Sequence, residues 1–264
     1  MPRTRGERQR ETMRSRRLHA VVAAMAAMMA LMVAAGAAQA VFPNFSGCTS
    51  RRIEEGVCVN IQNRSGNFEI KGFRVPLHES LEIRGKLVEN ETEIPTFIPP
   101  AGTTGFFARA EQVPGGLLGI EWLPGNSVLA ITELAGSPSA IRITPTRVEL
   151  PIKVRLVNVL IGMNCHIGNN SRPIRLNLIT GTTNPPPPNR PITGNNGVPT
   201  PIPGGFARIG QVNVDNTFAV PGATECGLGL GLINTLVNLR LGLPSAAGNN
   251  SIELVADAAL ALMP

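Results

Sequence analysis

The chain has 264 residues and a formal net charge of +6, from 24 Lys and Arg against 18 Asp and Glu. Residues 1–19 alone hold seven Arg and two Glu, so the rest of the chain has 17 basic and 16 acidic side chains. A nucleic-acid-binding protein needs a basic patch in its folded part. The near-neutral remainder therefore excludes nucleic acid as a partner.

The N-terminal segment has the parts of an export signal in the right order. After the Arg-rich start, residues 20–38 are uniformly apolar or small, and Ala38-Gln39-Ala40 matches the small-x-small pattern that a signal peptidase accepts. We expect a cleaved signal peptide at 1–40 and a mature chain that begins at Val41. A membrane anchor is the alternative, because about 17–25 apolar residues span a bilayer. Ala is only weakly apolar, so we expect cleavage and no integral membrane segment afterwards.

All four cysteines, Cys48, Cys58, Cys165 and Cys226, follow this signal. An even number of cysteines in an oxidising compartment predicts two disulfides. Three pairings can form. We favour Cys48–Cys58, which closes a short loop, and Cys165–Cys226, which joins two distant segments.

Short β-favouring runs recur between turn signals after Val41, and the frequent Gly and Pro disfavour long helices. The runs alternate apolar and polar residues, as strands do when one face of an antiparallel sheet covers a core. They cover residues 68–75, 81–88, 141–143, 148–150, 152–157, 174–178 and 236–241. The sequence therefore predicts an all-β protein, an antiparallel β-sandwich stapled by two disulfides.

An imperfect internal repeat predicts two duplicated β units, 41–144 and 145–264. Residues 107–113 resemble residues 206–212, and each stretch follows a Pro-Thr-x-Ile-Pro segment, at 95–99 and 199–203. Chance similarity in a chain rich in Pro and Gly is the alternative. The second unit contains a Pro-rich segment, 180–205, which predicts an exposed loop, either a stiff connection or a polyproline ligand for a partner.

The C-terminal segment predicts a hairpin. A strand over 236–243 is followed by turn residues at 244–250 and by a second apolar run at 252–263. For this last run a short helix is the alternative.

Side chains suited to catalysis or metal binding are scarce after the signal. The histidines are His78 and His166, the aspartates are Asp215 and Asp257, and none lies in a motif for nucleophilic catalysis. Cys165 and His166 are neighbours that could bind copper with a nearby thioether, but no second ligand pair completes such a site. We predict no catalytic, cofactor-binding or metal site.

Paired carboxylates are the remaining route to an enzyme, because a glycosidase needs two of them across a cleft. Most glutamates, for example Glu79, Glu82, Glu121 and Glu149, occupy alternating strand positions that indicate a solvated face. The chain has no Tyr and one Trp, Trp122. This scarcity of aromatic residues disfavours a carbohydrate-binding protein, and it also disfavours the aromatic girdles of an envelope pore.

Residues 164–168 (Asn-Cys-His-Ile-Gly), residues 173–183 and the proline run after them resemble a segment of uncharacterised exported proteins of high-GC Gram-positive bacteria. The resemblance covers the second half of the chain. It implies secretion and a β domain stapled by cysteines, and it implies no activity.

These observations predict a secreted or envelope-retained β protein without enzymatic activity, in a structural or binding role. The apolar strands and the Gly-Leu run at 227–231 favour self-association, a hydrophobic ligand, or binding to cell-wall or surface components. An extracellular hydrolase with paired carboxylates and a pore-forming β protein of the envelope are the alternatives.

Overall fold

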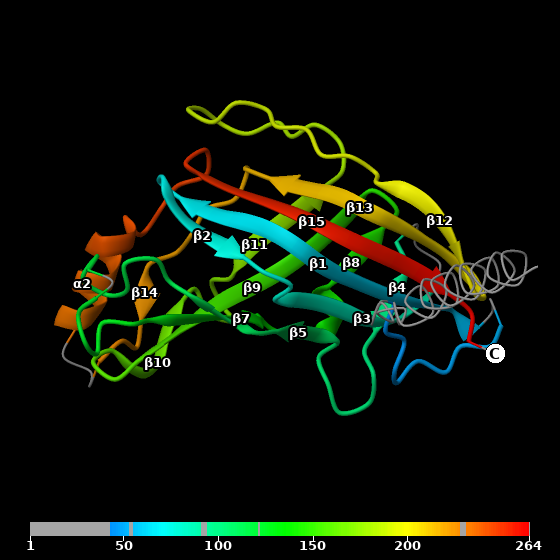
Figure 1. Ribbon diagram of the computed structural model, residues 1–264, viewed down its shortest axis with the longest axis horizontal. Helices are drawn as coiled ribbons and strands as arrows, with labels where there is room; N and C mark the ends of the chain where they lie inside the picture. The colour runs from blue at the N-terminus through cyan, green and yellow to red at the C-terminus, as the bar shows by residue number, and fades with distance from the viewer. Residues whose placement is uncertain (1–42, 53–54, 91–93, 121, 228–230, 264) are drawn as a thin grey trace, which may run out of the picture. The chain divides into compact units, whose positions relative to one another are not determined.

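The computed structural model describes residues 43–263 except 53, 54, 91–93, 121 and 228–230 (Figure 1). The predicted signal peptide, the cleavage site and the central residues of the Gly-Leu run lie outside the described residues. The described residues belong to the compact unit Phe42–Pro264, which has its own apolar core and both disulfides.

Antiparallel strands are the main secondary structure of this unit, and the 15 described strands belong to one hydrogen-bonded system. They are β1 (Val57–Ile70), β2 (Phe73–Leu77), β3 (Leu81–Val88), β4 (Thr96–Ile98), β5 (Phe106–Ala108), β6 (Ala110–Gln112), β7 (Leu129–Leu134), β8 (Arg142–Thr144), β9 (Arg147–Asn158), β10 (Gly162–Ile167), β11 (Ile174–Ile179), β12 (Val198–Ile202), β13 (Gly205–Asp215), β14 (Ala223–Thr224) and β15 (Asn250–Ala261). The described helices are the 3-10 turn η2 (Pro138–Ala140) and α2 (Leu232–Leu241).

The strands form two layers that pack face to face, so the predicted all-β sandwich is confirmed. One layer has the order β12-β13-β15-β1-β3-β4, with β2 and β5 at its edge, and the other is built around β9. A single residue pair, Ile179 with Val214, links the layers through β11 and β13. In Figure 1 the long strands β1, β13 and β15 cross in front of β9 and β11. Each layer takes strands from both 41–144 and 145–264, and the duplication stays a prediction.

Alternation along the strands places the core between the layers. In β15, Ile252, Leu254 and Ala256 face inward, while Glu253 between them is exposed. The predicted runs at 148–150 and 152–157 join into the one long strand β9. The run at 68–75 instead contains a turn at Lys71-Gly72 between β1 and β2, where both residues have positive φ. Gly makes that backbone conformation accessible at low cost.

The predicted C-terminal hairpin is wrong in its first half. Residues 232–241 form the helix α2, whereas residues 250–261 form the strand β15. Ile233, Val237 and Leu241 are four residues apart, so they share one helix face, and this face packs on the core. Gly231 and Gly242, both with positive φ, bound the helix. Residues 236–241 fit both a strand pattern and a helix pattern. The helix forms because it places Ile233, Val237 and Leu241 against the core.

The edges of the layer that contains β15 are short strands that contain prolines or lie beside them. Among the described strands, β4 pairs only with β3 and β12 only with β13. Pro95 and Pro99 flank β4, whereas β12 contains Pro199 and Pro201. In β12, Pro199 and Pro201 lie at alternate positions, so their missing N–H donors fall on the side away from β13. The Pro-rich segment 180–205 is therefore irregular only as far as residue 197, where an edge strand begins. Prolines at an edge discourage pairing with another chain.

Candidate functional site

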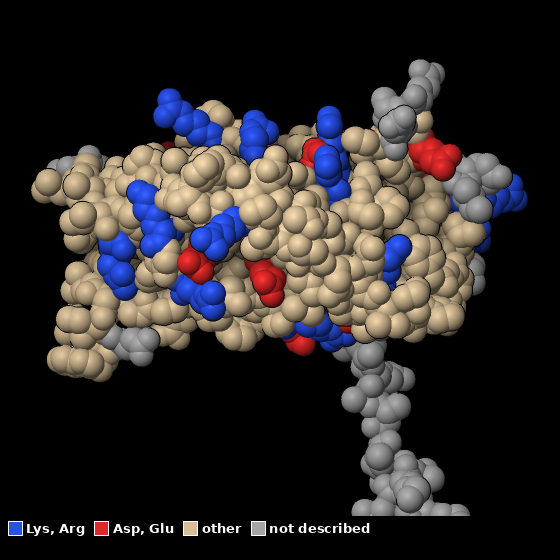
Figure 2. All heavy atoms as spheres, turned by 90° about the horizontal axis from the view of Figure 1, so that it is seen from above, with Lys and Arg blue, Asp and Glu red and all other residues tan. Residues whose placement is uncertain are grey.

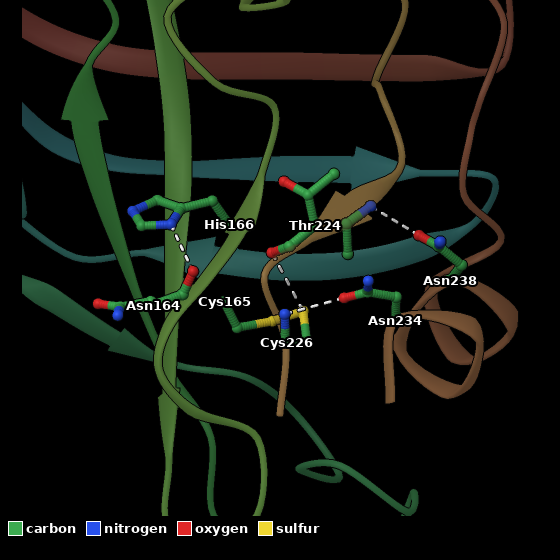
Figure 3. The surroundings of a disulfide bond; sticks show 8 residues. Asn164, Cys165, His166, Thr224, Cys226, Asn234 and Asn238 are labelled. Carbon is green, nitrogen blue, oxygen red and sulfur yellow. Dashed lines mark hydrogen bonds between the residues drawn. A yellow bond between two sulfur atoms is a disulfide. The ribbon is translucent and has the colours of Figure 1, made fainter. Parts of the chain in front are cut away.

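The four cysteines form the two predicted disulfides, Cys48–Cys58 and Cys165–Cys226. Because Cys165 is bonded to Cys226, its sulfur is not a thiolate ligand (Figure 3). His166 projects from the other face of β10, with its Nδ1 2.7 Å from the carbonyl oxygen of Asn164. Among the described residues no group of three His, Cys, Asp or Glu side chains is arranged to hold a metal ion.

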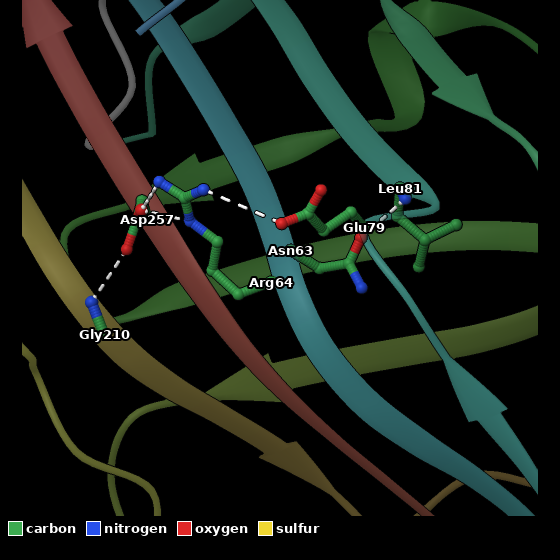
Figure 4. A network of polar contacts seen from close by, with 6 residues as sticks. All are labelled: Asn63, Arg64, Glu79, Leu81, Gly210 and Asp257. Atoms are coloured by element: carbon green, nitrogen blue, oxygen red, sulfur yellow. Dashed lines mark hydrogen bonds and ion pairs between the residues drawn. The ribbon is translucent and has the colours of Figure 1, made fainter. Parts of the chain in front are cut away.

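The structure does not bring the histidines and aspartates together. The Nδ1 atom of His78 lies 3.4 Å from Oε2 of Glu111, and the Nε2 atom of His166 lies 3.6 Å from Oε2 of Glu133. Buried Asp257 accepts from the Arg64 guanidinium at 2.5 Å and from the Gly210 N–H at 2.9 Å (Figure 4). These two contacts come from β-bulges in β1 and β13, the strands on either side of β15. Asp257 therefore links β15 to both neighbouring strands. Within the described residues it pairs with neither histidine.

The described glutamates singled out above lie in ion pairs, Glu82 and Glu149 on strands and Glu79 in the turn between β2 and β3. Glu79 pairs with Arg64, Glu82 with Arg84, and Glu149 with both Arg142 and Arg147, each at 3.7–3.8 Å. Glu121 lies outside the described residues. This arrangement is typical of a solvated face and offers no observation in favour of a hydrolase.

An unusual concentration of exposed apolar side chains lies at one end of the sandwich. Three segments converge there: the turns at 117–126, the β9–β10 hairpin turn at 158–163, and α2. We call this surface the apolar end, and its large exposed side chains are Leu118, Ile120, Trp122, Val159, Leu160, Met163, Leu232, Leu236 and Leu239. Three of them, Trp122, Val159 and Leu239, are more than 80% exposed.

Buried asparagines hold these segments in place from beneath. Asn126, only 2% exposed, donates to the carbonyl oxygens of Gly115 and Ile120 and accepts from the Leu118 N–H. Asn158 donates to the carbonyl oxygens of Gly125 and Ser127, both at 2.7 Å, which joins the hairpin turn to the first segment. The amides are thus inside and the apolar side chains outside, the reverse of the usual distribution.

The helix is tied to the hairpin in the same manner. The Gly227 N–H donates to the Ile161 carbonyl oxygen at 2.7 Å, and Cys226 is bonded to Cys165 of β10. Asn234 of α2 accepts from the Cys226 N–H, a contact that Figure 3 shows beside the disulfide. Beneath the surface, Leu117, Ile161 and Val237 line one small void, so all three segments are in contact. Hydrogen bonds, a disulfide and packing therefore hold the three segments of the apolar end together.

Few charged residues belong to the segments of the apolar end: the sequence gives Glu121, which lies outside the described residues, and Arg240. Among the described residues of 115–127, 158–164 and 231–242, Arg240 alone is charged, and its guanidinium lies 4.9 Å from the centroid of the Phe73 ring. In Figure 2, Lys, Arg, Asp and Glu lie along the body of one face, and the extreme left, where α2 lies in Figure 1, presents other residue types. Sequence reasoning missed this surface, although its turns contain Leu, Val and Trp where polar residues are usual.

A comparison of the chain with protein-family models, with curated proteins and with solved structures found no match in any of the three. No helix among the described residues has both the length and the apolar character needed to cross a membrane.

Proposed function

We propose that this protein is exported, has no enzymatic activity, and binds to a lipid surface of the cell envelope through the apolar end. The export signal at 1–40 and two disulfides support a location outside the cytoplasm. The observation that carries the proposal is the apolar end itself. Contiguous exposed apolar surface marks a place of interaction, and burying one such side chain contributes about 1.5–3 kcal/mol.

The shape of the apolar end favours a bilayer over a flat protein surface. Its most exposed side chains stand on two turns and on the outer face of a helix, so they can enter the interfacial region as separate anchors. Trp122 on a turn has the amphipathic ring that concentrates at the membrane–water boundary. The small number of charged residues lowers the cost of removing this surface from water.

The test is sedimentation of purified, oxidised residues 41–264 with lipid vesicles, neutral and anionic. We expect the protein to sediment with vesicles and the emission of Trp122, the chain's single Trp, to shift to the blue. A variant with Val159→Glu and Leu239→Glu should lose at least tenfold in vesicle affinity, since charged residues are costly in the bilayer.

Val198→Glu is the matched control, because Val198 is 66% exposed but lies on the edge strand β12, away from the apolar end. It should bind vesicles like the unchanged protein. Circular dichroism confirms the fold of each variant. Failure to sediment with either vesicle type, with constant Trp122 emission, would refute the proposal, and sedimentation with cell-wall material instead would identify another envelope component as the partner.

A further inference from the structure

A cavity of about 240 Å³ opens between the layers at the end of the sandwich where β9 begins. One wall is the inner face of β13, β15, β1 and β3, and the other is the β8–β9 turn with Ile143, Pro145 and Val148. The walls are mainly aliphatic. An apolar cavity of about 150 Å³ is already large enough to hold benzene, so this one has room for a longer apolar group.

Strand register explains why space remains here. Ala258 of β15 pairs with Ile61 of β1 on one side and with Arg208 of β13 on the other, so these three side chains form one row on the inner face. The small Ala side chain leaves the middle of the row empty. The next row towards the opening, with Phe206 and Val59 on either side of Leu260, forms the lip of the cavity.

The free space continues into the core. A second, smaller void shares Ile61 and Val148 with this cavity, and a third apolar void shares Leu150 and Leu254 with the second. The second and third voids also share Leu81 and Leu178, so every side chain common to two of these voids is aliphatic. The interior therefore offers a narrow apolar path along the sandwich, which suits one extended hydrocarbon chain better than a wide ring system.

A positive charge stands beside the apolar cavity. Arg208 is half-buried, and its Nη1 donates to the neutral carbonyl oxygen of Asn196 at 3.3 Å. Within the described structure no carboxylate lies within ion-pair distance of its guanidinium, which has five N–H donors. Glu89 also lines the opening, but it is exposed, so water and salt screen its charge.

A second polar group lies one row deeper. Gln211 is 5% exposed, and the one hydrogen bond that its side chain forms within the described residues is from Nε2 to the Asn213 Oδ1, at 2.9 Å. A buried amide and a guanidinium on an otherwise aliphatic wall match the pattern of a ligand pocket, where a few polar groups orient an apolar ligand.

We propose that this cavity binds a single-chain amphiphile with an anionic headgroup, the hydrocarbon chain entering between the layers and the carboxylate or phosphate pairing with Arg208. The Arg208 guanidinium has no acidic partner within the described structure, so it favours a ligand with an anionic headgroup. The narrow aliphatic path favours a ligand with one hydrocarbon chain. This inference is independent of the apolar end, which lies at the other end of β9.

Calorimetric titration of oxidised residues 41–264 with sodium dodecanoate, dodecyl phosphate and dodecyltrimethylammonium tests the proposal. We expect saturable binding of one or both anions below their micelle concentrations, and whichever binds more tightly identifies the headgroup. Arg208→Gln should weaken anion binding about tenfold or more, because it removes a charge-assisted hydrogen bond. The same variant should not weaken binding of the cationic amphiphile.

Ala258→Leu fills the empty middle of the row and should weaken binding of every chain at least tenfold. Because the added side chain enters free space, we expect the variant to fold, and Ile61→Phe, from the neighbouring strand, is a second variant that fills the cavity. Ala110→Leu is the matched control on the exposed edge strand β6 and should bind like the unchanged protein.

Three results would overturn the proposal: no saturable binding of either anion, unchanged binding by Ala258→Leu, or equal weakening of all three amphiphiles by Arg208→Gln. Adsorption to the apolar end is distinguished by the variant with Val159→Glu and Leu239→Glu. That variant should keep its dodecanoate affinity while it loses vesicle binding.

Discussion

At the scale of single residues, Asp215 connects the two layers where their backbones barely meet. β11 and β13 share one residue pair, and beside it the Asp215 carboxylate accepts from the Asn177 N–H at 2.6 Å and from the Thr217 N–H and hydroxyl at 2.8 Å. Burial raises the pKa of Asp215, and these hydrogen bonds only partly oppose the shift. Between β11 and β13, the Asp215 carboxylate therefore supplies a link between the strands that backbone hydrogen bonds supply elsewhere in the sheet.

Asp215→Ala should lower the free energy of unfolding by about 2 kcal/mol at neutral pH, because it leaves buried donors without an acceptor. Since the pKa of Asp215 is raised above its ordinary value of 3.8, its contribution to stability is fully present below pH 3.8 and is lost as the pH rises through the folded pKa. The deficit of the variant should therefore be largest in acid. Urea unfolding at several pH values measures this, and a deficit that grows with pH would contradict it.

Glu133 has the opposite pH dependence. Partial burial acts to raise its pKa, but the hydrogen bond from Arg155 at 2.6 Å and the charges of Arg155, Lys153 and His166 lower it overall. The resulting stability is present above the ordinary value of 4.5 and is lost as the pH falls below it. Glu133→Gln should flatten the acid limb of the stability curve.

Glu253→Gln is the control for Glu133→Gln, since Glu253 is exposed on β15 and forms no ion pair within the described residues. Urea midpoints between pH 3 and pH 6 compare the two variants. An acid limb that is equally steep in the unchanged protein and in Glu133→Gln would show that this cluster is too solvated to matter.

At the scale of elements, the Cys165–Cys226 disulfide fastens α2 to β10 and thereby shapes the apolar end. Without it, the segment that enters α2 would depend on three hydrogen bonds that its backbone N–H groups donate. Their acceptors are the side-chain oxygens of Asn234 and Asn238 and the carbonyl oxygen of Ile161. The Cys48–Cys58 disulfide closes a short loop before and within β1, far from this surface in the sequence.

Replacing Cys165 and Cys226 by Ala should cost about 4 kcal/mol, and replacing Cys48 and Cys58 about 3 kcal/mol, from the loop-closure entropy of the unfolded chain. The sequence separations behind these values are 61 and 10 residues. Chemical denaturation of the two variants measures which replacement lowers the free energy of unfolding more. The first pair of replacements should also change the emission of Trp122 in the folded protein, and the second should leave it unchanged. A larger loss from the second pair would show that native-state packing outweighs chain entropy here.

At the scale of the whole molecule, the apolar end and the cavity beside Arg208 lie at opposite ends of one strand. β9 begins at Arg147 beside the cavity and ends at Asn158 beneath the apolar end. Twelve strand residues span roughly 35–40 Å. A molecule that rests on a lipid surface at one end would hold the opening of its cavity away from that surface.

The two proposed sites should therefore act independently. Saturation with dodecanoate is expected to leave vesicle sedimentation within twofold of its value without ligand, because sites this far apart with no shared residues do not couple strongly. Sedimentation at fixed vesicle concentration with and without dodecanoate measures this. Displacement of the protein from vesicles by dodecanoate would place both ligands at the apolar end.

The sequence determined by itself whatever depends on neighbouring residues. Alternation identified β3, β9 and β11 among the strands of the core, because successive side chains of a strand point to opposite faces. It did not identify β7, β10 or β13. The spacing of the cysteines favoured the correct pairing, whereas the prolines of 199–203 predicted a loop where the structure has the edge strand β12. The helix α2 was not predicted. Its ten residues contain alternate apolar positions, as a strand has, and also apolar positions four residues apart, as a helix has.

Only the tertiary structure decided where function can reside. Trp122, Val159 and Leu239 are distant in sequence. Their segments come together through the pairing of β7 with β9 and of β9 with β10, and through the Cys165–Cys226 disulfide. In the same way, Ile61, Ala258 and Arg208 form one row only after three strands have paired. Local patterns specify which face of a strand is apolar, but pairing between distant strands determines which side chains share a surface.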